Sequence, residues 1–166
     1  MNSIKIYPGY TSEPFKGLQE GRRLSLDESD RQLTTEAFPN NVTSTGASVS
    51  KEGAILTFGK EHVSISLQGV FPNYTELEAA KLKEGRFIND RDMRERRKVL
   101  VLHEKTVRML FPKTEALGQY VDVQGVAYRV VGIYADQNSF SPSALVPFTT
   151  VQLVYGKGDS LSLIHI

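Results

Sequence analysis

The sequence predicts an α+β domain that combines mixed or antiparallel sheets with a few short helices. Three observations favour this fold class. Residues 99–102 are a continuous apolar run of strand length, which is typical of a strand buried on both faces. Between residues 54 and 68, apolar and polar positions alternate with a period of two, which indicates antiparallel strands with one wet, serine-rich face. Serine or threonine followed three residues later by glutamate marks the start of two short helices.

The first expected elements are a strand at residues 3–7 and a helix. Ser25 and Glu28 have the spacing of a capping box, in which the Ser25 hydroxyl accepts a backbone hydrogen bond and begins the helix. Pro39 ends this helix after Phe38. The residues expected on its inner face are Leu26, Leu33 and Ala37.

The alternating region predicts an antiparallel meander. Its strands are expected at residues 54–58 and 63–67, and an earlier, more polar strand at residues 42–50 would join them. Gly53 and Gly59 mark the expected turns between these strands.

A hinge into a second lobe is expected at residues 71–73, where a proline follows the last strand of the meander. Thr75 and Glu78 repeat the capping-box spacing and start a short helix that runs through Leu82. Gly85 is then expected as the C-terminal glycine of this helix.

Residues 98–136 form the unit around which the rest of the chain is organised. The buried strand at 99–102 leads into a short helix, because apolar residues at i, i+3 and i+4 form one stripe before Pro112. A hairpin follows, with strands at residues 120–123 and 127–134 around a Gln-Gly turn. The stripe consists of Val107, Leu110 and Phe111.

The C-terminal part begins with a polar loop at residues 137–143. Phe140 and Pro142 give this loop an apolar tip, which predicts either a contact with a partner or an ordinary connector. The remaining expected elements are a strand at 145–148, one or two helical turns at 149–155 and a last strand at 161–166.

Composition excludes several classes of function. The 166 residues have room for one core or two small lobes, and the net charge of +1 gives no strong electrostatic footprint for nucleic acid or anionic membranes. The absence of cysteine excludes thiol catalysis, disulfides and cysteine-based zinc sites. No run of about 20 apolar residues occurs, so no segment of this sequence is expected to span a bilayer.

No catalytic, cofactor-binding or metal-binding residue is predicted. Residues 53–60 look like a phosphate-binding loop, but five residues separate the two glycines and Glu61 replaces the required hydroxyl. His62, His103 and His165 each stand without a partner at metal-ligand spacing. His103 is the best single candidate for a general base, although a strand-end or helix-capping role is favoured.

A charged stretch precedes the buried strand. Asp90, Asp92 and Glu95 are interleaved with arginine and lysine, which predicts a solvated loop in which the charges neutralise one another. No aromatic residues accompany the basic ones, so nucleic-acid binding is not predicted. Arg86 differs, because arginine suits a bidentate contact to a neighbouring carboxylate or to helix carbonyls better than lysine does.

Several of these motifs occur together in one order. The motifs are Gly85-Arg86, Asp92, the strand at 99–102, Leu110-Phe111, Leu117-Gly118 and Val130-Val131-Gly132. In this order and spacing, the sequence resembles the extracytoplasmic, or periplasmic core, domain of MacB/FtsX-like ABC transporter permeases. The looser resemblance extends over most of the chain.

The resemblance implies two lobes. Residues 1–70 and 152–166 would form a porter-like first lobe, which continues further in the family and would therefore be incomplete at Ile166. Residues 71–151 would form a second, Sabre-like lobe. Gly85, Arg86 and Gly118 are the residues expected to have a structural or hinge role.

The resemblance also implies a function without chemistry in this domain. It would lie in the periplasm, tied to the bacterial inner membrane by helices outside this sequence, and would transmit ATP-driven conformational change. The implied partners are a cytoplasmic ATPase domain or subunit and a periplasmic adaptor or a lipoprotein or peptide substrate, in efflux or lipoprotein handling.

Two other classes of function stay open at this stage. One is a free-standing soluble binding module with no transporter attached, which would explain the serine-rich sheet face equally well. The other is an enzyme of unrecognised type, which would need a pocket that brings His103 or His62 together with distant carboxylates.

Overall fold

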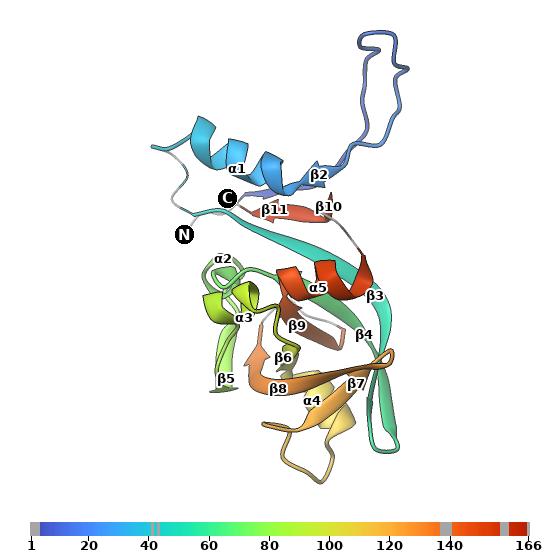
Figure 1. The fold of residues 1–166 in the computed structure, drawn as a ribbon, viewed down its shortest axis with the longest axis vertical. Helices are drawn as coiled ribbons and strands as arrows, with labels where there is room; N and C mark the ends of the chain where they lie inside the picture. The colour runs from blue at the N-terminus through green and yellow to red at the C-terminus, as the bar shows by residue number, and fades with distance from the viewer. Residues whose placement is uncertain (1–3, 41, 43, 137–140, 157–159, 166) are drawn as a thin grey trace.

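The expected α+β fold is confirmed by a computed structural model, which describes residues 4–40, 42, 44–136, 141–156 and 160–165 (Figure 1). The helices are α1 (Glu28–Ala37), α2 (Tyr74–Leu77), α3 (Asp90–Arg94), α4 (Glu104–Leu110) and α5 (Phe148–Tyr155). The strands are β1 (Lys5–Ile6), β2 (Leu26–Asp27), β3 (Gly46–Phe58), β4 (Glu61–Val70), β5 (Lys81–Gly85), β6 (Val99–His103), β7 (Tyr120–Val123), β8 (Val126–Ala135), β9 (Ser143–Pro147), β10 (Ser160–Leu161) and β11 (Leu163–His165). None of the helices in these ranges has the length and hydropathy needed to cross a bilayer.

The strands form one large mixed sheet and one small one. The large sheet has the order β1-β11-β3-β4-β9-β6-β8-β5, and β2 pairs separately with β10. The pairs β4–β9 and β6–β8 are parallel, and the other pairs are antiparallel. Because β7 pairs with both β3 and β8, the strands β3, β4, β9, β6, β8 and β7 close a ring.

Strand β6 is buried on both faces, as its apolar run predicts. Leu100 and Leu102 pack into the larger hydrophobic cluster, whereas Val101, on the opposite face, packs into a smaller one. Leu110 and Phe111 from the predicted stripe of α4 also join the larger cluster. The predicted hairpin is confirmed as β7 and β8. Residues 98–136 therefore form much of the core.

The long strand β3 contains a bulge at the position where the sequence predicts a turn. The predicted strands at 42–50 and 54–58 belong to this single strand, and its register against β4 shifts between Lys51 and Ala54. Gly53 lies in the bulge with a φ of 69°. The extra residue shifts the alternation of side chains between the two faces of the strand by one position. Val49 before the bulge and Ala54 after it therefore both face the core, although five positions separate them.

Helix α1 begins two residues later than predicted. Its N-cap is Asp27, whose carboxylate accepts hydrogen bonds from the backbone N–H groups of Ser29 and Asp30. The Asp30 carboxylate accepts from the Asp27 N–H in return, which completes a capping box. The predicted inner face is wrong at Leu33, which is 60% exposed, and at Ala37, because the helix buries no residue. Leu26 does pack against the larger hydrophobic cluster, but it belongs to β2.

The predicted helix through Leu82 is wrong as well. Helix α2 ends at Leu77, and Lys81–Gly85 is strand β5, paired antiparallel with β8. Gly85 is thus a strand residue with a φ of 72°, and a Cβ there would lie 2.3 Å from the Val131 carbonyl oxygen. Glycine is required at position 85 because the backbones of β5 and β8 approach each other closely there, and not because a helix ends at this residue.

A long arm precedes α1. Residues 9–24 project from the body as a narrow ribbon (Figure 1). Isolated bridges pair Tyr10 with Arg23 and Phe15 with Leu18. The side chains of Phe15 and Leu18 at the tip are exposed, so the arm contributes nothing to the hydrophobic clusters.

Candidate functional site

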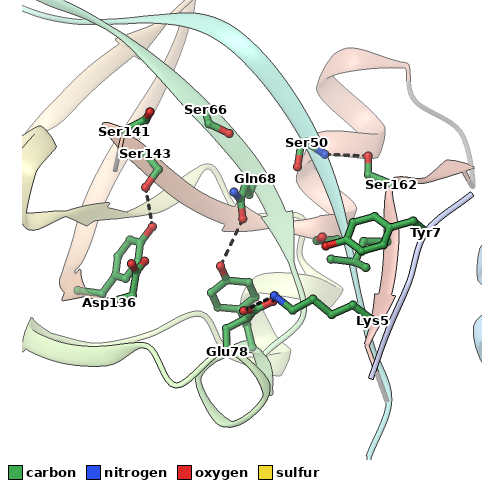
Figure 2. Close-up of a pocket in the computed structure, with 14 residues that line it drawn as sticks. Lys5, Tyr7, Ser50, Ser66, Gln68, Glu78, Asp136, Ser141, Ser143 and Ser162 are labelled. Atoms are coloured by element: carbon green, nitrogen blue, oxygen red, sulfur yellow. Dashed lines mark hydrogen bonds and ion pairs between the residues drawn. The ribbon is translucent and has the colours of Figure 1, made fainter. Parts of the chain in front are cut away.

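A polar groove of about 520 Å³ lies on the sheet face that points away from the larger hydrophobic cluster (Figure 2). Its walls come from parts of the chain that are far apart in sequence. The residues lining this polar groove are Lys5, Tyr7, Ser48, Ser50, Ser66, Gln68, Tyr74, Glu78, Tyr134, Asp136, Ser141, Ser143, Ser162 and Leu163.

The floor of the groove follows from strand alternation. Ser48 and Ser50 on β3 alternate with core residues, and Ser66 and Gln68 on the neighbouring β4 do the same. Ser143 adds a third strand, because Ser66 of β4 pairs with it in the parallel ladder to β9. The predicted serine-rich face at residues 54–68 is therefore confirmed on β4, where Ser66 and Gln68 form part of the floor of the groove.

An ion pair crosses the mouth of the groove. The Lys5 ammonium on β1 lies 2.6 Å from one carboxylate oxygen of Glu78, just after α2, and donates a hydrogen bond of 2.7 Å to the other. Figure 2 shows the two side chains reaching toward each other. The pair joins segments 73 residues apart, so no local pattern in the sequence could have found it.

Tyr74 and Tyr134, two of the tyrosines that line the groove, are neutral hydrogen-bonding groups. The Tyr74 hydroxyl donates to the Gln68 side-chain oxygen at 3.3 Å, and the hydroxyls of Tyr134 and Ser143 share a hydrogen bond of 2.8 Å. Burial raises the pKa of both phenols far above neutral pH. These residues can donate and accept hydrogen bonds, but they cannot act as bases.

The floor is fixed from below by helix α4. The Thr106 hydroxyl, which is fully buried, donates to the Ser143 carbonyl oxygen at 2.9 Å and accepts from the Ser143 N–H at 3.0 Å. These reciprocal bonds hold the β9 end of the groove against the rigid core.

His103 has the capping role that the sequence favoured. It is the N-cap of α4, and its Nδ1 accepts a hydrogen bond from the Lys105 N–H at 3.2 Å. The residue is 1% exposed, and its ring packs edge-on against the ring of Tyr134, with 5.1 Å between the two ring centroids. Burial lowers the pKa of the imidazole, and neither His103 nor the exposed His62 lines the groove. The general-base hypothesis has no geometric support here.

A second constellation surrounds Asp92. Arg86 donates to both carboxylate oxygens of Asp92, at 2.6 and 3.0 Å, which is the bidentate contact expected for this arginine. Asp92 is fully buried, and it also accepts from the Asn89 N–H while Asn89 caps α3. The prediction of a solvated loop at 90–95 is wrong, because these residues form a capped helix.

The remaining predicted site residues have mixed outcomes. Phe140 lies outside the described residues, and Pro142 is half-buried, its carbonyl oxygen accepting from the Ser66 N–H at 3.1 Å. A partner contact at this loop stays a prediction. The hinge role of Gly85, Arg86 and Gly118 also stays a prediction, as does the division into two lobes. In the described ranges, no group of three or more potential ligands could hold a metal ion.

Comparison with known proteins places these features in a family. The model of the MacB-like periplasmic core domain matches residues 1–166. The macrolide export ATP-binding/permease protein MacB of Mannheimia succiniciproducens is 25% identical over 169 residues, covering 99% of this chain and 26% of the relative. Its counterpart from Neisseria meningitidis serogroup A is 26% identical over 155 residues, which cover 90% of this chain and 23% of that relative. The chain thus spans about a quarter of the length of these relatives.

Two crystal structures share the fold. The extracellular domain of the noncanonic ABC-type transporter YknZ from Gram-positive bacteria matches with a TM-score of 0.82 and 21% identity, covering 99% of this chain and 82% of that one. The periplasmic region of MacB from Actinobacillus actinomycetemcomitans matches with a TM-score of 0.81 and 25% identity, and the match covers 99% of this chain and 73% of that one. The family resemblance seen in the sequence is confirmed, and the chain belongs to the MacB-like periplasmic core domains.

Proposed function

We propose that this chain is the extracytoplasmic domain of an ABC transporter permease, and that it relays ATP-driven motion to a periplasmic partner or substrate. The observation that carries the proposal is the family match over the whole chain. The relatives are named ATP-binding/permease proteins and are about four times longer, so the ATPase and the membrane helices would come from other segments or subunits.

The contacts in the domain suit a relay of this kind. The ring of strands β3, β4, β9, β6, β8 and β7 forms a rigid body around a dense core. The N-terminal strand β1 contacts the segment after α2 through the Lys5–Glu78 ion pair, which is partly exposed. An exposed ion pair contributes about 0–1 kcal/mol, so this contact can open and close at low cost.

The proposal includes a place and a set of partners. The domain would lie on the periplasmic side of a bacterial inner membrane, with an ATPase domain or subunit in the cytoplasm. Its target would be a periplasmic adaptor in efflux, as the macrolide export relatives suggest, or a lipoprotein or peptide substrate. The domain itself would do no chemistry.

A free-standing binding module is the second candidate, and the polar groove favours it. A domain that only relays motion needs no cavity of about 520 Å³ lined by hydroxyl groups. The native gene separates the two candidates. Apolar stretches of about 20 residues, one before this segment and three after it, would support the permease.

Topology labelling tests the proposal directly. The chain has no cysteine, so Glu36→Cys on the exposed face of α1 gives the intact protein a unique thiol within this domain. We expect a membrane-impermeant maleimide to label it in cells whose outer membrane has been permeabilised. A cysteine placed in the ATP-binding segment is the control and should react only after lysis. Protection of both thiols until lysis would overturn the proposed location.

A further inference from the structure

The polar groove has the composition of a ligand site. Six of its fourteen lining residues are serines, which come from strands β3, β4 and β9, from the segment just before β9 and from the residue between β10 and β11. The hydroxyls of Ser48 and Ser50 have no hydrogen-bond partner among the described residues. Unpaired hydroxyls that share one concave surface are available to a ligand that brings its own donors and acceptors.

The charges of the groove disfavour an anion. Lys5 is the one basic residue in the lining, and Glu78 already neutralises it at 2.6 Å. Asp136 also lines the groove, and the Ser66 hydroxyl donates to Glu52 at 2.7 Å. A phosphate or carboxylate would therefore meet net negative charge without a free cation to pair with.

Apolar ligands and peptides fit less well. An apolar ligand would remove the serine hydroxyls from water without replacing their hydrogen bonds, which costs about 1–3 kcal/mol for each group. An extended peptide usually binds to a free sheet edge through its backbone. The floor strands have no such edge, because β3 lies between β11 and β4, and β4 lies between β3 and β9.

One wall supplies an aromatic face. Tyr7, which follows β1, lines the groove and is 64% exposed, and Figure 2 shows its ring pointing toward the groove. Sugar rings present hydroxyls at their edges and C–H groups on their faces, so they pair with hydroxyls on one side and an aromatic ring on another. We propose that the polar groove binds a neutral carbohydrate of one or two sugar units. Its volume lies within the range of small-molecule sites.

This inference goes beyond the proposed function, since a relay of motion needs no ligand of its own. The test uses the whole extracytoplasmic segment of the intact protein, because the domains of the relatives that were crystallised separately extend beyond the part that this chain matches. Backbone amide chemical shifts are followed during titration with maltose and with diacetylchitobiose, both neutral disaccharides. Glucuronate serves as the anionic probe and tetra-alanine as the peptide probe.

We expect at least one neutral disaccharide to shift the amides of the groove residues. Ser50→Ala and Tyr7→Ala should each weaken its binding by about 3- to 10-fold, which corresponds to the loss of one neutral contact. Ser64→Ala is the matched control, since this exposed serine lies on the same face of β4 outside the groove and should leave binding unchanged.

Three results would overturn the proposal: no shift of the groove amides with either disaccharide up to about 50 mM, tighter binding of glucuronate or tetra-alanine than of both disaccharides, or equal losses in Ser50→Ala and Ser64→Ala. Each would remove the proposed site for a neutral carbohydrate and leave the transporter role, which topology labelling tests, untouched.

Discussion

The N-terminal region, residues 4–45, and the central region, residues 80–135, are built in opposite ways. Eight of the thirteen large hydrophobic side chains that are exposed in the described residues belong to the N-terminal region, among them Phe15, Leu33 and Phe38. In the central region, every residue of strand β6 is buried. The N-terminal region is held instead by two-residue ladders, a helix cap and the Lys5–Glu78 pair.

This difference teaches where the stability of the domain resides. Burial of apolar surface is the dominant stabilising contribution to folding, so the central region contributes far more to the free energy of unfolding than the N-terminal region does. The N-terminal region can rearrange without disturbing the core, because few buried contacts would be lost. Substitutions should therefore have large effects in one region and small ones in the other.

The largest effect is expected for Leu100→Ala in β6. The side chain is fully buried in the larger cluster, and its truncation leaves a cavity, so the free energy of unfolding should fall by about 3–5 kcal/mol. Urea denaturation measures this change. The matched variant Leu33→Ala on α1, where leucine is 60% exposed, should change it by less than about 0.5 kcal/mol. Similar losses in both variants would contradict the comparison.

A smaller loss is expected for Asp92→Asn. The substitution removes the charge that pairs with Arg86 and weakens the cap of α3, and the partly exposed arginine keeps some hydration. We expect a loss of about 2–3 kcal/mol in the free energy of unfolding. Glu95→Gln, which breaks the exposed pairs with Arg91 and Arg97, should cause a much smaller loss, because water and salt screen exposed charges. A loss below 1 kcal/mol for Asp92→Asn would mean that the buried pair contributes little.

Two glycines of the central region form the next test. Gly85 and Gly118 both have positive φ, but a Cβ would meet the Val131 carbonyl oxygen at Gly85 and nothing within 4 Å at Gly118. Gly118→Ala should therefore cost about 1 kcal/mol for backbone strain alone. Gly85→Ala should cost about 1 kcal/mol more, because strands β5 and β8 must move apart. Equal thermal melting shifts would show that the close approach is not required.

A pH-dependent effect is expected from His103. Burial lowers the pKa of its imidazole in the folded protein, and protonation would remove the lone pair that accepts from Lys105. The unfolded chain therefore binds the proton more readily, so the free energy of unfolding should fall as the pH drops below about 6.5. His103→Asn keeps a capping oxygen and should flatten this slope between about pH 7 and 5, whereas His62→Asn should not. An unchanged slope in His103→Asn would place the titration elsewhere.

The sequence also predicted the central region better than the N-terminal region. Strand β6, the β7–β8 hairpin and the cap of α4 by His103 follow from local patterns, and the structure confirms them. The start of α1 was missed because Asp27 and Asp30 compete with Ser25 as capping residues. Helix α3 was missed although Asn89 and Asp92 have capping-box spacing, since the dense charge suggested a loop.

The groove was only half predictable. The alternation of Ser66 and Gln68 with core residues indicated part of its floor, which is a local property of one strand, whereas Ser48 and Ser50 on β3 were not singled out. Its walls depend on tertiary contacts, such as Lys5 with Glu78, that join distant segments. Strand β5 was assigned to a helix for the same reason, because its partner β8 lies about 50 residues later and overrides the local helical pattern.

The most direct test of the relay is a distance measured across the Lys5–Glu78 contact in the intact transporter. Spin labels at Glu36→Cys on α1 and Lys83→Cys on β5 occupy exposed positions, and Figure 1 shows α1 and β5 on opposite sides of α2, which Glu78 follows. Pulsed electron paramagnetic resonance then compares the nucleotide-free state with a state trapped by ADP and vanadate. Our account predicts that the distance distribution changes between these states in the intact transporter and not in the isolated domain. Identical distributions in both states of the intact transporter would contradict it.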